Sequence, residues 1–265
     1  MLDLKKINLW LLDMDGTLYL GDRLFPFTIP LLTLLKERGK KYLFMTNNSS
    51  KSVADYVKKL ARLGIPAQES DFINSSMATA YYLEKHYKDR FMYVQGTRSL
   101  KDALRARGFR VTDVYSEDVN CVVTGFDTEL TFQKLEDLSR ILLNKEIPYI
   151  ATNPDLVCPT EFGSVPDCGS VSEMLYNSTG RRPKFIGKPA PLMPQLAMET
   201  WGYAPEETIV IGDRIYTDIK SGLNAGTRTA LVMSGETTPE ILAASPDKPE
   251  AVYRDCGEIL ELLKA

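Results

Sequence analysis

The sequence predicts an α/β fold, with a doubly wound core on a parallel sheet and an α/β cap domain inserted into that core. Two observations lead to this prediction. Apolar runs of strand length alternate with amphipathic helical stretches, which is the order of parallel strands joined by helices. Gly and Pro residues mark most of the boundaries between these runs. With 265 residues, the chain has room for one large or two modest domains.

The opening elements of the core are expected in residues 1–88. Residues 7–12 are apolar apart from Asn8, which is typical of a central strand buried on both faces. The expected elements are a strand over 7–12, a helix over 29–38, a strand over 41–45, a helix that Ser52 can cap and that reaches Leu63, and a helix over 76–87.

The cap is expected in residues 89–182, which look like an α/β unit of their own. Its expected strands lie over 91–94, 121–124 and 149–152, and its helices over 99–107, 132–144 and 171–178. Residues 153–169 contain three prolines and two glycines without a clear period, which predicts a long binding loop. The core resumes in 183–265, with strands over 184–186, 208–211 and 229–233 and helices over 192–201, 218–225, 239–244 and 257–263.

Composition excludes several classes of function. The net charge of −3 and the pI near 5.4 do not indicate the basic character that is typical of nucleic-acid-binding proteins. No apolar run approaches the roughly 20 residues that span a membrane, and the short run 7–12 does not resemble a signal peptide, so we expect a cytoplasmic protein. The four cysteines show no C-x-x-C spacing, and His86 is the only histidine, which excludes multi-histidine zinc sites. The chemistry must therefore use carboxylates, lysine, hydroxyls or a hard metal ion.

The first strand ends in Asp13-Met14-Asp15-Gly16-Thr17. Parallel sheets bind ligands beyond the carboxyl ends of their strands, and residues two apart in an extended segment point the same way. We therefore expect Asp13 and Asp15 to converge on a hard cation such as Mg²⁺. An EF-hand is excluded because Leu18 stands where its glycine is required. The alternative is a pair of aspartates that only form a turn and cap a helix.

The second strand ends in Thr46-Asn47-Asn48, just before a helix. A hydroxyl, two amides and the N–H groups of a helix N-terminus make a neutral cradle for a phosphate. The same residue types are also ordinary helix caps, and these residues alone leave both interpretations open.

Two further motifs follow the cap. Asp213 comes after the β-branched strand 208–211, where it is placed to be a metal ligand, and Asp218 is expected to orient its neighbours and to cap the next helix. Lys188 stands just past the strand 184–186, in a backbone stiffened by Pro189 and Pro191.

These four motifs, in this order, resemble those of the haloacid dehalogenase-like phosphatase superfamily. The matching patterns are D-x-D-G-T at 13–17, the strand-end Thr46, Lys188 and G-D-x-x-x-x-D at 212–218. The T-N-N-S, G-K-P and G-D-R-x-x-T-D patterns resemble the p-nitrophenylphosphatase (NagD-type) subgroup, in which a large cap stands between the second and third motifs. The resemblance implies a Rossmann-like core, a Mg²⁺ cofactor and phosphatase activity.

The resemblance also implies roles for individual residues. Asp13 would attack phosphorus, and Asp15 would protonate the leaving group and then activate water. Asp13, the backbone carbonyl of Asp15 and Asp213 would hold Mg²⁺, while Lys188 would neutralise charge on the transferring group. Phosphate oxygens would be bound by Thr46, Asn47 and Asn48.

The cap loop would recognise the leaving group, and Asp155 matches the N-P-D pattern of the subgroup. Asp155, Glu161 and Asp167 make this loop acidic, which predicts a preference for leaving groups rich in hydroxyls or bearing an amine over bisphosphates. The subgroup has a more glycine-rich stretch where 167–170 stand, so the identity of the substrate stays open.

We therefore expect a Mg²⁺-dependent phosphomonoesterase that acts through an aspartyl phosphate. Two alternatives stay open, a phosphomutase-type phosphoryl transfer and a regulator that binds a phosphometabolite without catalysis. The expected partner is a small phosphorylated metabolite, such as a sugar phosphate or a nucleotide, and neither nucleic acid nor a membrane. A homodimer is one option for assembly.

Overall fold

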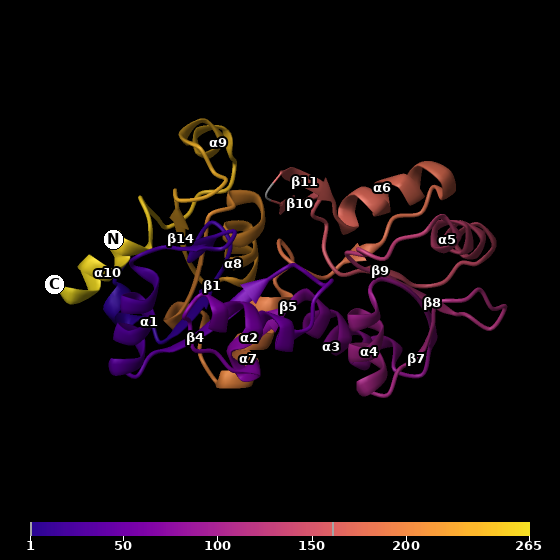
Figure 1. The fold of residues 1–265 in the computed structure, drawn as a ribbon, viewed down its shortest axis with the longest axis horizontal. Coiled ribbons are helices and arrows are strands. Elements are labelled where there is room, and N and C mark those ends of the chain that lie inside the picture. The colour runs from indigo at the N-terminus through magenta and orange to yellow at the C-terminus, as the bar shows by residue number, and fades with distance from the viewer. Residues whose placement is uncertain (1, 161) are drawn as a thin grey trace. The chain divides into compact units, whose positions relative to one another are not determined.

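The structure, a computed structural model, describes residues 2–160 and 162–265. Its contacts divide the chain into two compact units. The first holds the residues up to Thr46, Tyr56–Ile73 and Lys188–Ala265, and the second holds Asn47–Asp55 and Asn74–Gly187. Each unit is built on a parallel sheet with helices packed against it, so the predicted α/β class is confirmed (Figure 1).

The first unit is organised around a six-stranded sheet with the order β15-β14-β13-β1-β4-β5. The strands are β1 (Leu9–Leu12), β4 (Lys41–Thr46), β5 (Phe72–Asn74), β13 (Thr208–Gly212), β14 (Arg228–Val232) and β15 (Ala251–Tyr253). β1 pairs in parallel with both β4 and β13, and all four of its residues are buried. Because the chain builds β4 on one side of β1 and later adds β13 on the other, the topological switch point lies between β1 and β13.

Helices cover this sheet. They are α1 (Thr28–Glu37), α2 (Val53–Arg62), α7 (Leu192–Trp201), α8 (Lys220–Ala225), α9 (Pro239–Ala244) and α10 (Cys256–Lys264), and α1 packs against α10 while α7 packs against α8 (Figure 1). Ser52 caps α2 as predicted, because its hydroxyl accepts the Asp55 N–H while the Asp55 carboxylate accepts the Ser52 N–H. This reciprocal pair is a capping box.

The first unit also contains short elements that the sequence analysis did not predict. They are the hairpin β2 (Tyr19–Leu20) with β3 (Arg23–Leu24), the edge strands β5 and β15, and the 3₁₀ turns at Leu4–Lys6, Glu69–Asp71 and Pro205–Glu207. The helical segment predicted over 218–225 begins at Ile215 in the structure. It consists of a π-helical turn over Ile215–Ile219 followed directly by α8.

The second unit holds a five-stranded sheet with the order β12-β9-β8-β6-β7. Its strands are β6 (Phe91–Gln95), β7 (Arg110–Thr112), β8 (Cys121–Thr124), β9 (Tyr149–Ala151) and β12 (Lys184–Phe185), all paired in parallel. Its helices are α3 (Ser75–Tyr87), α4 (Arg98–Ala106), α5 (Phe132–Asn144) and α6 (Cys168–Thr179). The unit thus contains the range 89–182, together with α3, β12 and residues 47–55.

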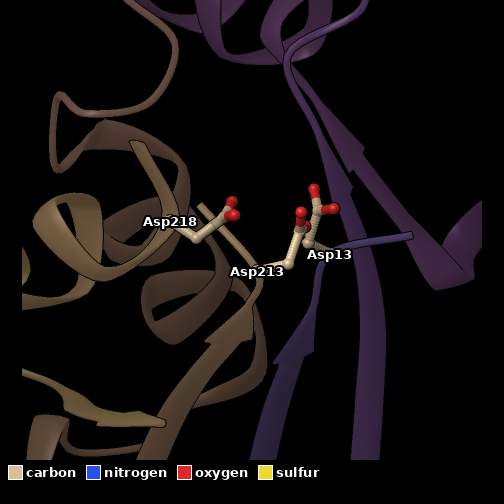
Figure 2. Close-up of side chains that lie close together, drawn as sticks. All are labelled: Asp13, Asp213 and Asp218. Carbon is tan, nitrogen blue, oxygen red and sulfur yellow. The ribbon is translucent and has the colours of Figure 1, made fainter. Parts of the chain in front are cut away.

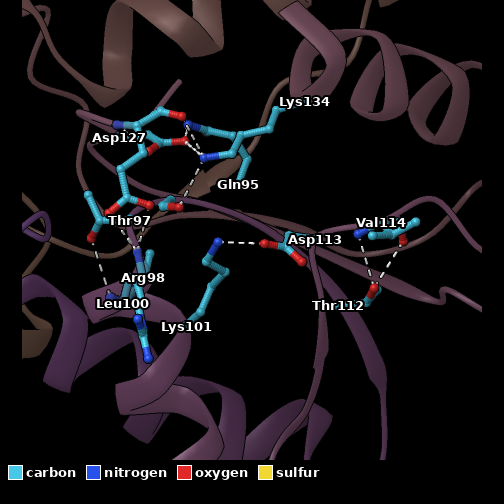
Figure 3. A network of polar contacts seen from close by, with 12 residues as sticks. Gln95, Thr97, Arg98, Leu100, Lys101, Thr112, Asp113, Val114, Asp127 and Lys134 are labelled. Atoms are coloured by element: carbon cyan, nitrogen blue, oxygen red, sulfur yellow. Dashed lines mark hydrogen bonds and ion pairs between the residues drawn. The ribbon is translucent and has the colours of Figure 1, made fainter. Parts of the chain in front are cut away.

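A buried polar network ties the strand ends of this second sheet together (Figure 3). The Asp127 carboxylate, just past β8, accepts hydrogen bonds from Lys134 Nζ at 2.8 Å and from Gln95 Nε2 at 3.1 Å. On the same unit, Lys101 Nζ bonds the Asp113 carboxylate at 2.6 Å. Because each buried charge has an opposite charge beside it, the network holds β6, β8 and α5 in one arrangement.

Residues 153–169 were predicted to be a loop, and this prediction was wrong. β10 (Val157–Thr160) pairs antiparallel with β11 (Gly163–Pro166), so a hairpin stands in the segment. Of the three acids expected to give this segment its charge, Asp167 is buried and caps α6, and Glu161 lies outside the described residues. Within the described residues, no helix is long and apolar enough to cross a membrane.

Candidate active site

Two of the three acids that the sequence analysis assigned to a metal, Asp13 and Asp213, leave neighbouring strands at the switch point. Asp13 follows β1 and Asp213 follows β13, and the Asp13 N–H donates to the Ile211 carbonyl at 2.8 Å, which continues the parallel ladder. Since parallel strands end at one edge of a sheet, both carboxylates come out at that edge.

Asp218 joins them. Oxygens of Asp13, Asp213 and Asp218 all lie within 4.8 Å of one another, and Figure 2 shows the three side chains converging. Asp218 and Asp213 are almost fully buried, whereas the Asp13 side chain keeps 14% of its surface exposed. The π-helical turn brings Asp218 here, and its carboxylate also accepts the N–H of Arg214 at 3.1 Å, the residue just before that turn. Asp218 thus lies among the acids and inside the π-helical turn, and it does not cap α8, whose N-cap residue is Ile219.

A single lysine enters the same cluster. Lys188 Nζ lies 2.6 Å from Asp13 Oδ1 and 2.5 Å from Asp218 Oδ1, and it also donates to the Met45 carbonyl at 3.3 Å. Lys188 is 3% exposed, and the peptide bond that follows it, to Pro189, is cis. One positive charge therefore stands among three carboxylates.

This imbalance of charge changes how easily the carboxylates ionise. Burial, and then the charge of Asp218, raise the pKa of Asp13 to about 8. The same two causes raise the pKa of Asp213 to about 6. Burial would lower the pKa of Lys188, but the adjacent carboxylates of Asp13 and Asp218 raise it, so the ammonium stays charged. Without a further cation, the site favours a protonated Asp13.

Glycines let the backbone approach Asp213 closely. A Cβ atom on Gly16, whose φ is +85°, would lie 2.5 Å from Asp213 Oδ2, and one on Gly235 would lie 2.0 Å from it. The site thus offers carboxylate oxygens in a cluster with an excess of negative charge, which is the donor set that a hard divalent cation takes. The residues present fit such an ion.

A polar loop that the sequence analysis did not assign also surrounds Asp213. After β14, the Glu236 N–H donates to Asp213 Oδ2 at 2.7 Å, and the Ser234 hydroxyl donates to the Gly16 carbonyl at 2.7 Å. Thr17 Oγ1 approaches Asp213 Oδ1 at 3.4 Å. The signal was in the sequence, since Ser234-Gly235-Glu236 is another polar run directly after a buried strand.

Asp15 does not join the cluster of carboxylates. Its side chain is exposed, and its Oδ1 accepts the N–H of Gly21 at 3.4 Å. The expected convergence of Asp13 and Asp15 on one cation therefore does not extend to the Asp15 carboxylate, because β1 ends at Leu12 and a turn starts at Met14, whose carbonyl accepts the N–H groups of Thr17 and Leu18.

The remaining candidates divide between the two units. Thr46 ends β4 in the first unit. In the second unit, Asn48 Oδ1 accepts the Ser50 N–H at 2.9 Å, and Asn47 Nδ2 donates to both oxygens of Asp155 at 3.1 Å. Asp155 is thus brought together with a predicted phosphate-binding residue.

Known proteins are similar to this chain in sequence. Family models match two parts of the chain, haloacid dehalogenase-like hydrolase over residues 10–110 and HAD-hydrolase-like over residues 185–259. The 5'-nucleotidase YutF of Bacillus subtilis is 36% identical over 240 residues, covering 91% of this chain and 92% of its own. The acid sugar phosphatase of Staphylococcus haemolyticus is 32% identical, covering 98% of both chains.

The chain belongs to the haloacid dehalogenase-like hydrolase family.

Solved structures place it more narrowly within that family. The 4-nitrophenylphosphatase of Thermotoga maritima is 41% identical, covers 97% of this chain and 98% of its own, and superposes with a TM-score of 0.91. A NagD protein is 39% identical over the whole of both chains, with a TM-score of 0.89. The predicted resemblance to NagD-type haloacid dehalogenase-like phosphatases is confirmed, and the chain is a phosphomonoesterase of this type.

Divalent metal is a feature of this family. The glycerol phosphate phosphatase of Mycobacterium tuberculosis has been solved in complex with magnesium. It is 26% identical with a TM-score of 0.90, and the match covers 98% of this chain and 78% of that chain. The same enzyme has also been solved in complex with calcium. A divalent metal is thus consistent with the donor set of Asp13, Asp213 and Asp218.

Proposed function

We propose that this haloacid dehalogenase-like enzyme is a Mg²⁺-dependent phosphatase that hydrolyses small phosphomonoesters through an aspartyl phosphate on Asp13. One observation carries the proposal, the convergence of three carboxylates at the switch point of the sheet, two of which, Asp13 and Asp218, bond Lys188. Such a cluster repels itself unless a cation joins it, and a phosphoryl group brings oxygens that the same cation can bind.

In the first step, an ionised Asp13 oxygen attacks phosphorus. The new bond from Asp13 to phosphorus forms while the bond from phosphorus to the leaving oxygen breaks, and Asp15 gives its proton to that oxygen. The exposed position of Asp15 supports this role, because its carboxyl group is open to a leaving group and to water.

In the second step, water attacks the phosphorus of the aspartyl phosphate. Asp15 takes a proton from that water, the bond from Asp13 to phosphorus breaks, and inorganic phosphate leaves. Asp13 and Asp15 then regain their starting protonation states, so the cycle closes without a further reactant.

Other residues hold the phosphoryl group and its charge. Lys188 places its ammonium beside the attacking oxygen of Asp13, where it counters charge on the transferring group. Thr46, Asn47 and Asn48 would donate hydrogen bonds to phosphate oxygens, and they follow one another directly at the end of β4.

The metal site would be formed by Asp13, Asp213 and the backbone carbonyl of Asp15, with Asp218 beside them. When bound there, Mg²⁺ supplies positive charge that offsets the charge of the phosphoryl group and favours the ionised form of Asp13. The raised pKa of Asp13 supports a need for such a cation.

The substrate class is a small phosphomonoester, such as a sugar phosphate or a nucleotide. Relatives named 5'-nucleotidase, acid sugar phosphatase, glycerol phosphate phosphatase and 4-nitrophenylphosphatase support this breadth. Residues 89–182 would act as the cap that selects the leaving group, with Asp155 at its edge. The proposal places the enzyme in the cytoplasm with a small metabolite as its partner, and with a homodimer as one option.

A panel of phosphomonoesters tests the proposal, with free phosphate measured in Mg²⁺ and in excess chelator. We expect phosphate release in Mg²⁺ alone, and none from the Asp13→Asn variant. Transfer of the phosphoryl group to a second sugar hydroxyl without free phosphate would instead indicate a phosphomutase. Binding without turnover on every compound would indicate a regulator.

A further inference from the structure

The main-chain carbonyl of Asn47 is held from two directions. It accepts the Ser75 hydroxyl at 2.5 Å and the Asn153 Nδ2 at 3.0 Å. Ser75 opens α3, and Asn153 follows β9, so two separate segments of the second unit meet at this one oxygen. Both donors are fully buried. Two buried side chains that share one carbonyl fix its direction more firmly than either alone.

The Asn47 side chain is fixed as well. Its Nδ2 bonds both oxygens of Asp155, and Asn153 Oδ1 accepts the N–H of Asp155 at 3.0 Å. Asn153 therefore connects the backbone of Asn47 with the backbone of Asp155. A Cβ atom on Gly187 would lie 2.5 Å from Asn47 Oδ1, so the amide packs directly on the backbone there.

Ser49 anchors the next part of the segment. Its Oγ accepts the N–H of Phe126 at 2.9 Å and lies 2.9 Å from Thr152 Oγ1, at the ends of β8 and β9. Ser49 is fully buried, and Thr97 Oγ1 donates to the carbonyl of Ser50 at 3.0 Å. The segment after β4 is thus tied to the second unit along its length.

We propose that Ser75 and Asn153 are positioning residues that set the orientation of the phosphate-binding segment Asn47–Asn48. The inference rests on the proposed function, which gives that segment the phosphate. A peptide unit is planar and trans, so the direction of the Asn47 carbonyl also sets the direction of the Asn48 N–H. Ser75 and Asn153 therefore control a phosphate donor without touching the substrate.

This role predicts that the two residues act on the phosphoryl group, which every substrate shares, and leave discrimination between leaving groups unchanged. The loss of one hydrogen bond to a main-chain carbonyl corresponds to a factor of about 3 to 10 in binding. Because Ser75 and Asn153 share one acceptor, their effects should not be independent.

The experiment compares Ser75→Ala, Ser75→Thr, Asn153→Ala and the double variant Ser75→Ala/Asn153→Ala with the wild type. Ser172→Ala is the matched control, because Ser172 is a buried serine of the same unit whose hydroxyl donates to a carbonyl of its own helix, that of Cys168, and not to the carbonyl of Asn47. Binding of inorganic phosphate is measured by calorimetry in Mg²⁺, which needs no turnover. The ratio kcat/KM is measured on p-nitrophenyl phosphate and on a sugar phosphate.

We expect Ser75→Ala and Asn153→Ala each to weaken phosphate binding by about 3 to 10-fold and to lower kcat/KM by a similar factor on both substrates. Ser75→Thr keeps the hydroxyl and should stay within about twofold of the wild type, as should Ser172→Ala. The double variant should lose less than the product of the two single losses.

Wild-type phosphate affinity in both single variants, or a loss confined to one substrate, would overturn the inference. If Ser75→Ala does not fold, Asn153→Ala decides by the same criteria. A wild-type enzyme that released no phosphate from any ester would refute the proposed function instead, and the calorimetric comparison would still report whether Ser75 and Asn153 support phosphate binding.

Discussion

Lys188 Nζ donates a hydrogen bond to Asp13 Oδ1 across 2.6 Å, although 175 residues separate the two in the chain. The same ammonium reaches Asp218, so the one lysine in the acidic cluster is already shared between two carboxylates. The negative charge that Lys188 does not neutralise must be offset by a bound metal ion or by protonation of a carboxylate.

Asp13→Asn should abolish turnover, with a loss of about 10³-fold or more, because an amide does not attack phosphorus. The fold should survive, since the change removes one of three crowded negative charges. Asp15→Asn should lower kcat by about 10² to 10⁴-fold through the loss of acid–base catalysis. Steady-state release of phosphate measures both, and the thermal midpoint shows that each variant is folded. Wild-type activity in Asp13→Asn would refute the proposed nucleophile.

Removal of the metal by a chelator should abolish activity, and Mg²⁺ should restore it, with Ca²⁺ a poor substitute because its longer and more numerous bonds loosen the in-line geometry. Asp213→Ala should raise the Mg²⁺ concentration needed for half-maximal activity by at least about tenfold. Asp102→Ala, a change at an exposed acid of the second unit, is the control and should leave it unchanged. Full activity in excess chelator would exclude the ion.

The metal-free protein should lose stability as the pH rises from about 6 to about 8.5. An unfolded aspartate has a pKa near 3.9, whereas the pKa of Asp13 in the fold is about 8, so the folded state binds more protons in this window. Stability then falls with rising pH, by about 1.4 kcal/mol per pH unit where the folded state binds one full proton more than the unfolded state. Scanning calorimetry in chelator measures it.

The control for this pH dependence is Asp13→Asn, which should flatten it. Mg²⁺ should raise the thermal midpoint most at the alkaline end, because only ionised carboxylates bind the ion. A midpoint that rises between pH 6 and 8.5 without metal would contradict the expected sign.

Lys188→Met should destabilise the metal-free protein at pH 8.5 by roughly 3 to 5 kcal/mol, because it leaves buried carboxylates without their counter-charge. The loss should be smaller at pH 6, where Asp13 accepts a proton. Denaturant unfolding at the two pH values provides the comparison. An equal loss at both would indicate that the lysine stem, and not its charge, carries the effect.

Asp155→Ala should lower kcat/KM on p-nitrophenyl phosphate as well as on the best substrate. The sequence analysis expected Asp155 to act on the leaving group alone, which would spare p-nitrophenyl phosphate. The structure changes this expectation, because the carboxylate of Asp155 binds the amide of Asn47. A pair of kcat/KM ratios, variant against wild type, decides between the two. A loss confined to the best substrate would restore the earlier view.

Much of the fold could be predicted because strong local patterns decide it. The helices over 132–144, 192–201 and 239–244 have the predicted bounds, since their apolar spacing and caps are written in consecutive residues. The acids of the core were predicted for a similar reason, because a carboxylate directly after a buried apolar strand has few structural explanations.

What could not be predicted depends on partners distant in the chain. The hairpin β10–β11 contains two prolines and a glycine that locally indicate a loop, and only cross-strand pairing makes it a sheet. The place of Asp218 within the carboxylate cluster follows from a π-helical turn, which has no clear sequence signal. The hydrogen bonds of Ser75 and Asn153 to Asn47 join three separate segments, and no local pattern reports such a meeting.

The attachment of residues 47–55 to the second unit sets a rule for chimeric enzymes. A designer who exchanges caps between relatives would naturally cut at the ends of the insertion and leave everything before it with the recipient. Ser49, however, fits between the strand ends of its own cap through Phe126 and Thr152, and a foreign cap would meet it with different side chains. A cassette for cap exchange should therefore carry two pieces of donor sequence, the long one over 74–187 and the nine residues over 47–55.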